Sequence, residues 1–282
     1  MALVRKVTTS LSLPTTPNEP PTGLDDYCAM IYGRKQWGKS TMASQYPNSI
    51  NFQFEPGRRG LRILQVSPRS YQEAIEYLAL FIESEHERVI IDTVDRFYDS
   101  LLMEECKNLS NGEKDHPGKF GKEGVSIWDF VKNKFESLFV TIKDSGKQFT
   151  LISHDKRVEQ KDRDGVEWVR IEPTCKPAAW KIAQSMCDFV FHVDFLNGER
   201  IVTVRDLDNT TLASCNPEID CFLDPDGNPL RRFKIANEKE KSFSSLLNAF
   251  NNEVHDYDYS PPKKPLTVKK GLKQPTPAMA KA

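Results

Sequence analysis

The stretch Gly33-Arg34-Lys35-Gln36-Trp37-Gly38-Lys39-Ser40 has the spacing G-x-x-x-x-G-K-S of a phosphate-binding loop, or P-loop. It follows the apolar run 27–32 and precedes residues 39–45, which are compatible with a helix. Strand, loop and helix in this order are the context that the motif requires. Glycine makes up about 7% of average proteins, so a chance match in such a chain is on the order of one in a hundred. The sequence therefore predicts a nucleotide-binding P-loop.

Each residue type in the loop has a chemical reason. Glycines let backbone N–H groups close around phosphate oxygens, and the N-terminus of the next helix adds a favourable dipole. Lys39 can reach the β- and γ-phosphates, and Ser40 can ligate magnesium. We therefore expect ATP and Mg²⁺ as ligands. The predicted nucleotide-binding residues are Gly33, Arg34, Lys35, Gln36, Trp37, Gly38, Lys39, Ser40 and Thr41.

Two residues make this loop unusual. Many loops of this class carry a further glycine where Gln36 stands, and Trp37 is bulky for a position beside phosphates. Trp37 could pack against the base or against a neighbouring subunit. The alternative to a working loop is a glycine turn with an exposed lysine, or a loop that has kept its shape and lost its ligand. Nucleotide binding is therefore a safer expectation than fast turnover.

Three acidic or basic residues end predicted strands. Residues 88–92, Arg-Val-Ile-Ile-Asp, have the form of a Walker B strand, so Asp92 and Ser40 are the predicted metal site. Glu55 follows the strand 50–54, where a carboxylate could deprotonate the water that attacks the γ-phosphate. His154 follows the strand 148–153 and could sense that phosphate. Lys39, Glu55 and His154 are thus the predicted catalytic residues.

Each of these roles has a structural alternative. Asp92, or Asp95 beside it, could only cap the next helix. Glu55 could be an exposed acid before a Pro-Gly turn, and His154 could be satisfied at its strand end.

The middle of the chain alternates short apolar runs with longer amphipathic stretches, which favours an α/β fold with a mainly parallel central sheet flanked by helices. Strands are expected at 27–32, 50–54, 89–92, 148–153, 189–193 and 201–205. Helices are expected at 39–45, 71–83, 95–107, 128–143, 178–186 and 243–250. A hairpin is expected over 155–169, because Asp164-Gly165 is a good turn dipeptide.

The two ends of the chain differ from its middle in composition. The first 22 residues are rich in Thr, Ser and Pro, and residues 260–282 combine five prolines with six lysines and no acid. Such compositions do not support a packed core. We therefore expect a flexible arm over 1–22, one folded domain over 23–255 and a disordered tail over 256–282. The tail lysines could bind polyanions or only solubilise the protein.

Overall composition limits the setting in which the protein works. The net charge of −1 gives no global attraction for nucleic acid, so any such site must be a local patch. The six cysteines include no CxxC pair and no cluster with zinc-ligand spacing, which fits a reduced cytoplasmic setting. No apolar run approaches the roughly 20 residues that span a bilayer, so we expect no membrane partner.

The order and spacing of these motifs resemble phage-type nucleotide-binding proteins with a RecA-like core, including single-strand annealing proteins related to the RecA/RadA recombinases. The segments that carry the resemblance, within residues 25–206, are 33–40, Glu55 with Gly57, 89–93 and 151–154. The resemblance implies a RecA-type ATPase with a central Walker A strand. It implies that Glu55 activates water, that Ser40 and Asp92 hold magnesium, and that His154 is a sensor.

The resemblance also implies action on single-stranded DNA in phage recombination or replication, in the host cytoplasm. Such proteins often form rings or filaments in which a basic residue of one subunit completes the neighbour's site. Arg200 or Arg205 is the candidate for this trans-acting role, and a solvated strand position is the alternative for either. A single-strand-binding protein is a further candidate partner.

In RecA-like proteins the loops after the Walker B and sensor strands face DNA, and both corresponding stretches contain several lysines or arginines here. Cations beside an aromatic ring suit phosphate contact with base stacking. Nearby acids almost cancel the charge of the second stretch, so a solvated hairpin is the alternative. The candidate DNA-binding residues are Lys119, Lys122, Lys156, Arg157, Lys161, Arg163 and Trp168.

Three functions therefore remain open from the sequence. The first is an ATPase acting on single-stranded DNA in annealing or strand exchange. The second is a non-hydrolytic annealing or helicase-loader module for which ATP is only an assembly ligand. The third is a small-molecule P-loop kinase, although no arginine-rich lid is evident.

Overall fold

The computed structural model describes residues 13, 15–55, 60–109, 127–161, 163, 165, 167–206 and 208–257. Most of the predicted arm and tail lie outside these residues, as do Gly57, Lys119 and Lys122. The predicted domain boundaries at 22/23 and 255/256 stay predictions.

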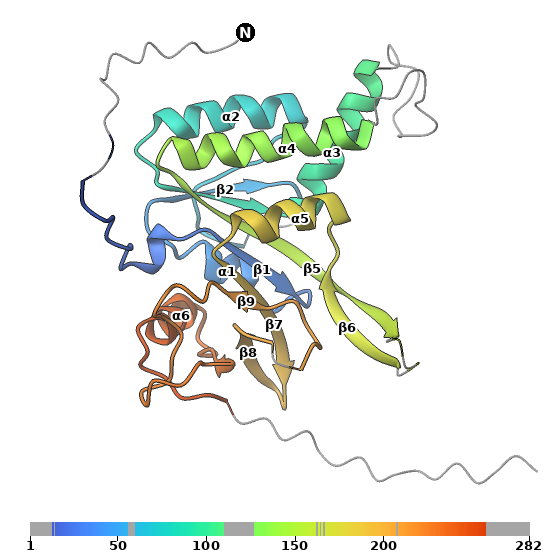
Figure 1. Cartoon of the computed structure of the whole chain (residues 1–282). Coiled ribbons are helices and arrows are strands. Elements are labelled where there is room, and N and C mark those ends of the chain that lie inside the picture. Colours follow the sequence, from blue (N-terminus) through green and yellow to red (C-terminus); the bar gives the residue numbers. More distant parts are fainter. Residues whose placement is uncertain are drawn as a thin grey trace, which may run out of the picture.

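In the described part of the chain, ten strands join into one sheet with the order β10-β8-β7-β1-β5-β4-β2-β3, while β6 pairs with β5 and β9 with β7 (Figure 1). Strands β3, β2, β4, β5, β1 and β7 are parallel to their neighbours along this path, and β8 and β10 add to it antiparallel. The strands are β1 (Ala29–Gly33), β2 (Ser49–Gln53), β3 (Gln65–Val66), β4 (Arg88–Asp92), β5 (Gln148–Lys161), β6 (Glu167–Pro173), β7 (Phe189–Leu196), β8 (Glu199–Thr203), β9 (Ser214–Cys215) and β10 (Arg232–Lys234). The predicted α/β class, with the P-loop strand in the centre, is confirmed.

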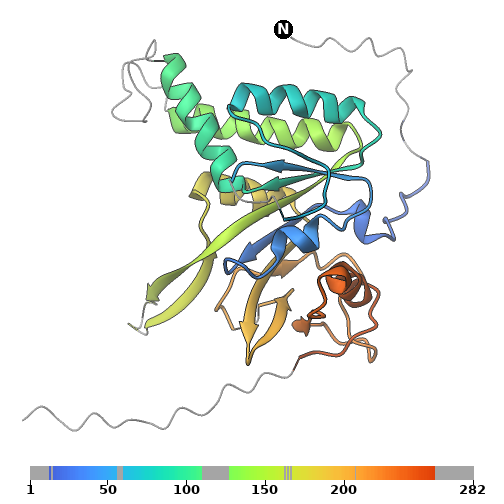
Figure 2. The same ribbon diagram turned by 180° about the vertical axis from the view of Figure 1, so that it is seen from behind.

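Helices cover both faces of the sheet. The helices are α1 (Lys39–Ala43), α2 (Tyr71–Glu83), α3 (Val94–Leu109), α4 (Ile127–Asp144), α5 (Pro177–Met186) and α6 (Ser242–Phe250), with short 3-10 turns η1 (Leu24–Asp26) and η2 (Lys239–Lys241). Helices α2 to α5 lie on one side of the sheet and α1 and α6 on the other (Figures 1 and 2). The side chains of the first group pack into one apolar core, and those of the second group pack into another. Because helices cover both faces of the sheet, the central strands are buried on both sides, and their sequences are continuous apolar runs.

Strand β1 contributes side chains to both apolar cores. All five of its residues are buried. Met30 and Tyr32 enter the core beneath α2 to α5, whereas Ala29 and Ile31 enter the core beneath α1 and α6. This division follows from the two-residue period of a strand.

The predicted hairpin exists, but it is continuous with a core strand. Strand β5 is buried from Phe149 to Ser153 and then runs on through exposed and partly buried positions to Lys161. It pairs with β6 from Asp155 onward. Figures 1 and 2 both show the β5–β6 ribbon projecting from the body of the molecule. The sequence divides this strand in two because its burial changes halfway along.

Candidate active site

The P-loop backbone depends on conformations that glycine adopts most easily. Gly33 ends β1 with φ of 149°, and a Cβ there would lie 2.1 Å from the carbonyl oxygen of Val193. Gly38 precedes α1 with φ of 106°. Gln36 also has a positive φ, of 63°. The left-handed backbone at Gln36 explains why glycine is common at this place in other loops, and it shows that glutamine adopts it here.

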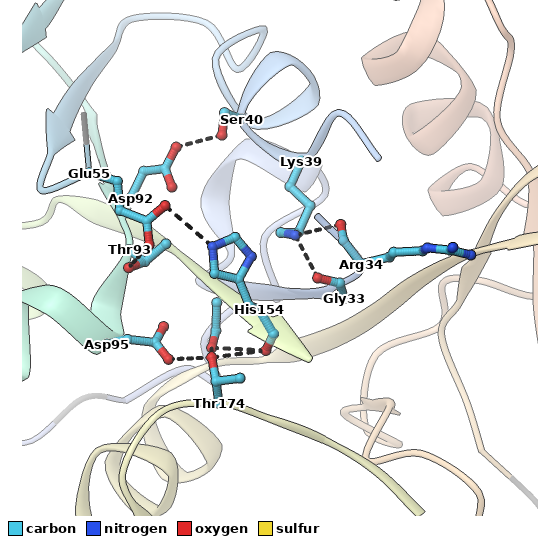
Figure 3. A network of polar contacts seen from close by, with 11 residues as sticks. Gly33, Arg34, Lys39, Ser40, Glu55, Asp92, Thr93, Asp95, His154 and Thr174 are labelled. Atoms are coloured by element: carbon cyan, nitrogen blue, oxygen red, sulfur yellow. Dashed lines mark hydrogen bonds and ion pairs between the residues drawn. The ribbon is translucent and has the colours of Figure 1, made fainter. Parts of the chain in front are cut away.

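Lys39 closes the loop from its first helical position. Its Nζ donates hydrogen bonds to the carbonyl oxygens of Gly33 at 2.6 Å and Arg34 at 2.9 Å (Figure 3). The side chain is buried. The ammonium group is therefore fixed at the mouth of the strand–loop–helix turn, where a phosphate would meet it.

Ser40 in α1 and Asp92 at the end of β4 are in direct contact. The Ser40 hydroxyl donates to Asp92 Oδ2 at 2.5 Å, and both side chains are buried (Figure 3). Hydroxyl and carboxylate oxygens are the donors that Mg²⁺ prefers, so the pair fits this cation. Among the described residues, no group of three or more His, Cys, Asp or Glu side chains could hold a metal alone. A cation here would therefore complete its shell with phosphate oxygens and water.

The Glu55 carboxylate lies between Thr93, which follows β4, and His154, which lies within β5. Its Oε1 accepts from the Thr93 hydroxyl at 3.3 Å, and its Oε2 is 3.3 Å from His154 Nε2. The Glu55 side chain is 26% exposed and that of His154 16% exposed, so water can reach both. Strands β2 and β4 end at the same edge of the sheet, where the parallel strand β5 leaves the core and runs on into the hairpin, and this brings these side chains beside Asp92 (Figure 3).

The hydrogen bond that the His154 backbone accepts could not be predicted from the sequence. The backbone N–H of Thr174, the residue after β6, donates to the His154 carbonyl oxygen at 2.9 Å. The Thr174 hydroxyl donates to Asp95 Oδ1 at 2.5 Å (Figure 3). The base of the hairpin is thus hydrogen-bonded to His154, the predicted sensor, and to the start of α3. Asp95 was expected at most as a helix cap, and no pattern marks Thr174.

Trp37 packs inside its own chain, contrary to the expectation of a base or a neighbouring subunit. Its ring is 2% exposed, and its Nε1 donates to the carbonyl oxygen of Asp194 in β7 at 2.9 Å. The Trp37 side chain is therefore not a candidate phosphate contact, whereas the backbone of this residue still is.

The trans-acting role of Arg200 or Arg205 stays a prediction, and the structure shows only which groups of the same chain each guanidinium contacts. Arg200 is 8% exposed, and its Nη1 donates to the Ala236 carbonyl oxygen at 3.0 Å. The guanidinium of Arg205 donates to the carbonyl oxygens of Phe222 and Leu230 at 2.6 and 3.0 Å. Both guanidinium groups therefore have hydrogen-bond partners within the same chain.

The described DNA-binding candidates all lie on the hairpin, but on both of its faces. The register pairs Gln160 with Trp168 and Lys161 with Glu167. Because alternate residues share a face, Lys156 and Trp168 lie on one face, whereas Arg157 and Lys161 lie on the other. Arg163 is exposed between the two strands. A ligand that contacts all of these residues would have to wrap around the ribbon.

A cavity of about 290 Å³ separates the P-loop from the foot of the hairpin. Its lining combines three cations with two carboxylates and one apolar side chain. The lining residues are Arg34, Asp155, Lys156, Arg157, Ile171 and Asp194. One residue of the P-loop and two of the predicted DNA-binding residues therefore line the same cavity.

Comparison with known proteins agrees with this geometry. The family described as an AAA domain matches residues 25–211, from η1 past β8. The chain belongs to this AAA-domain family. The match includes the P-loop, Glu55, Asp92 and His154, and with the fold it makes the protein a P-loop NTPase with a RecA-like core.

Two further comparisons place this AAA domain beside known proteins. No curated protein matches the chain. A solved structure of a KaiC-like protein from the hyperthermophilic archaeon Pyrococcus horikoshii is similar, with 11% identity and a TM-score of 0.42 over 77% of this chain and 88% of that one. In the described part of the AAA domain, no helix has the length and apolar character to cross a membrane.

Proposed function

We propose that this AAA domain binds ATP with Mg²⁺ and hydrolyses the γ-phosphate. The observation that carries the proposal is the convergence of Lys39, Ser40, Asp92, Glu55 and His154 at one edge of the parallel sheet. Ligands of open α/β sheets bind at the carboxyl ends of the strands. Each of these side chains stands at that edge.

The residues divide the chemistry among them. Lys39 binds and orients the phosphates, and Ser40 and Asp92 would hold Mg²⁺, which neutralises charge on the phosphate oxygens when bound. Glu55 accepts the proton of the attacking water, because its carboxylate is accessible and held by Thr93 and His154. His154 orients Glu55 through their 3.3 Å contact.

We further propose that the substrate of the coupled action is single-stranded DNA, in phage recombination or replication by annealing or strand exchange. The hairpin supports this proposal, because it presents cations and Trp168 and its foot contacts the His154 backbone through Thr174. A cytoplasmic homo-oligomer, with a single-strand-binding protein as partner, completes the proposal. The six cysteines are free thiols, as the cytoplasm would keep them.

One experiment tests substrate, coupling and assembly together. Phosphate release is measured with Mg²⁺ while single-stranded DNA is titrated, beside size-exclusion chromatography with and without ATP. We expect turnover that DNA stimulates and a larger assembly with nucleotide. ATP binding without turnover would favour the loader module, turnover indifferent to DNA would remove the DNA part, and transfer to a small-molecule acceptor would identify a kinase.

A further inference from the structure

On the β7–β8 side of the P-loop, Trp37 and Arg200 form a buried stack. The guanidinium carbon lies 4.5 Å from the centroid of the indole ring. Arg200 Nη2 is 2.9 Å from the place where a Cβ on Gly38 would stand. The guanidinium thus lies against the two loop residues that precede Lys39. This contact explains why Trp37 turns away from the nucleotide side.

The charge of Arg200 has no carboxylate partner among the described residues. Its Nη1 donates to a neutral carbonyl oxygen, and its buried Nε has no hydrogen-bond partner there. The adjacent Glu199 pairs with Lys234 at 2.9 Å instead. Burial alone lowers the pKa of Arg200, yet an arginine stays protonated in proteins. A buried cation of this kind is costly unless an anion approaches it.

The stack rests on the C-terminal part of the chain. The Ile235 N–H donates to the Arg200 carbonyl oxygen at 2.8 Å, next to the Ala236 carbonyl that accepts from the guanidinium. Beyond α1, Gln45 Nε2 donates to the Lys239 carbonyl oxygen at 2.7 Å, and Gln45 Oε1 accepts from the Phe243 N–H at 3.1 Å. The segment 235–243 therefore holds the P-loop and its helix at both ends.

We propose that Arg200 is a positioning residue of the nucleotide site, which braces Trp37 and Gly38 in cis and holds a buried positive charge behind the phosphate loop. The inference rests on the proposed ATP binding and deepens it. Because Coulomb attraction grows with the charge of the ligand, Arg200 favours nucleoside triphosphates over diphosphates and diphosphates over monophosphates.

The test compares three nucleotides on the full-length protein. Titration calorimetry gives the affinities of ATP, ADP and AMP with Mg²⁺ for wild type, Arg200→Met and Arg200→Lys. We expect Arg200→Met to weaken ATP binding roughly tenfold, ADP binding less and AMP binding least. Arg200→Lys keeps the charge and should recover part of the loss, and added salt should narrow the differences. The matched control is Lys234→Met, an exposed cation on β10 that does not contact the loop and should leave all three affinities unchanged.

The outcomes separate this inference from the function on which it rests. If wild type binds ATP and Arg200→Met binds it equally well, or loses the same factor for all three nucleotides, Arg200 is only structural. If wild type binds no nucleotide, the proposed function falls and the inference falls with it. Should Arg200→Met fail to fold, Arg200→Gln retains a donor for the Ala236 carbonyl. The same comparison of ATP, ADP and AMP affinities then tests the proposal with this variant.

Discussion

Replacing the carboxylate of Glu55 by an amide separates catalysis from folding. Among the contacts of Glu55 with described residues are those of 3.3 Å to Thr93 and His154, and its side chain is 26% exposed. Losing such long and partly solvated contacts costs less than about 1 kcal/mol of folding free energy. Glutamine has the same length, and its amide oxygen can accept from the Thr93 hydroxyl. The variant Glu55→Gln should therefore fold and bind ATP like wild type.

Turnover should respond very differently. A positioned general base accelerates a reaction by about 10²–10⁴-fold. At about 1.36 kcal/mol for each factor of ten, Glu55→Gln should raise the barrier by about 3–5 kcal/mol. The effect on the barrier is thus several times larger than any effect on stability.

Single-turnover phosphate release, beside calorimetric ATP binding and urea unfolding, measures the three quantities on one preparation. The matched control is Glu76→Gln on the exposed face of α2, where the carboxylate contacts only Gln72 among the described residues. A Glu55→Gln protein that turns over at the wild-type rate would remove Glu55 as the base. A loss of ATP affinity parallel to the loss of turnover would also contradict the reasoning.

Three further outcomes follow from the geometry. Lys39→Ala should weaken ATP binding at least tenfold in calorimetry, because a charged donor contributes about 1.5–3 kcal/mol, and unchanged binding would refute the P-loop assignment. Gly33→Ala should cost about 2–4 kcal/mol in urea unfolding, because its Cβ would meet the Val193 carbonyl, whereas Gly146→Ala, at φ of 75° in open space, should cost only about 1 kcal/mol. Burial raises the pKa of Tyr46 from 10.0 to about 12, so the neutral phenol's contribution is complete below pH 10 and about 3 kcal/mol of it is lost as the pH rises through 12. Tyr46→Phe should reduce that alkaline loss, and an identical pH profile would disprove the assignment to Tyr46.

The nucleotide edge could be read from the sequence because its signals are local. The P-loop, Asp92, Glu55 and His154 each follow an apolar run, and parallel strands put all their carboxyl ends on one side. Once the strands are known to be parallel, it follows that these residues lie near one another at the same edge of the sheet. Their roles stay predictions until the variants are measured.

The hairpin could be read only in part. A good turn dipeptide at Asp164-Gly165 predicts two paired arms, but cross-strand register decides which side chains share a face. A shift of one residue would exchange the two faces, and no local pattern excludes that shift. The strands β3 and β9 escaped prediction because two residues cannot show a period.

The unusual residues of the P-loop are explained by contacts far along the chain. Trp37 bonds to Asp194, 157 positions away, and stacks on Arg200, so its bulk is used to anchor the loop rather than to touch the nucleotide. The same stack holds Arg200 against the loop of its own chain. Its support at Ala236 lies beyond residue 211, where the AAA-domain match ends. The structural unit that shapes this nucleotide site is therefore larger than the family motif, because the chain returns through β10 and α6 to hold the loop in place.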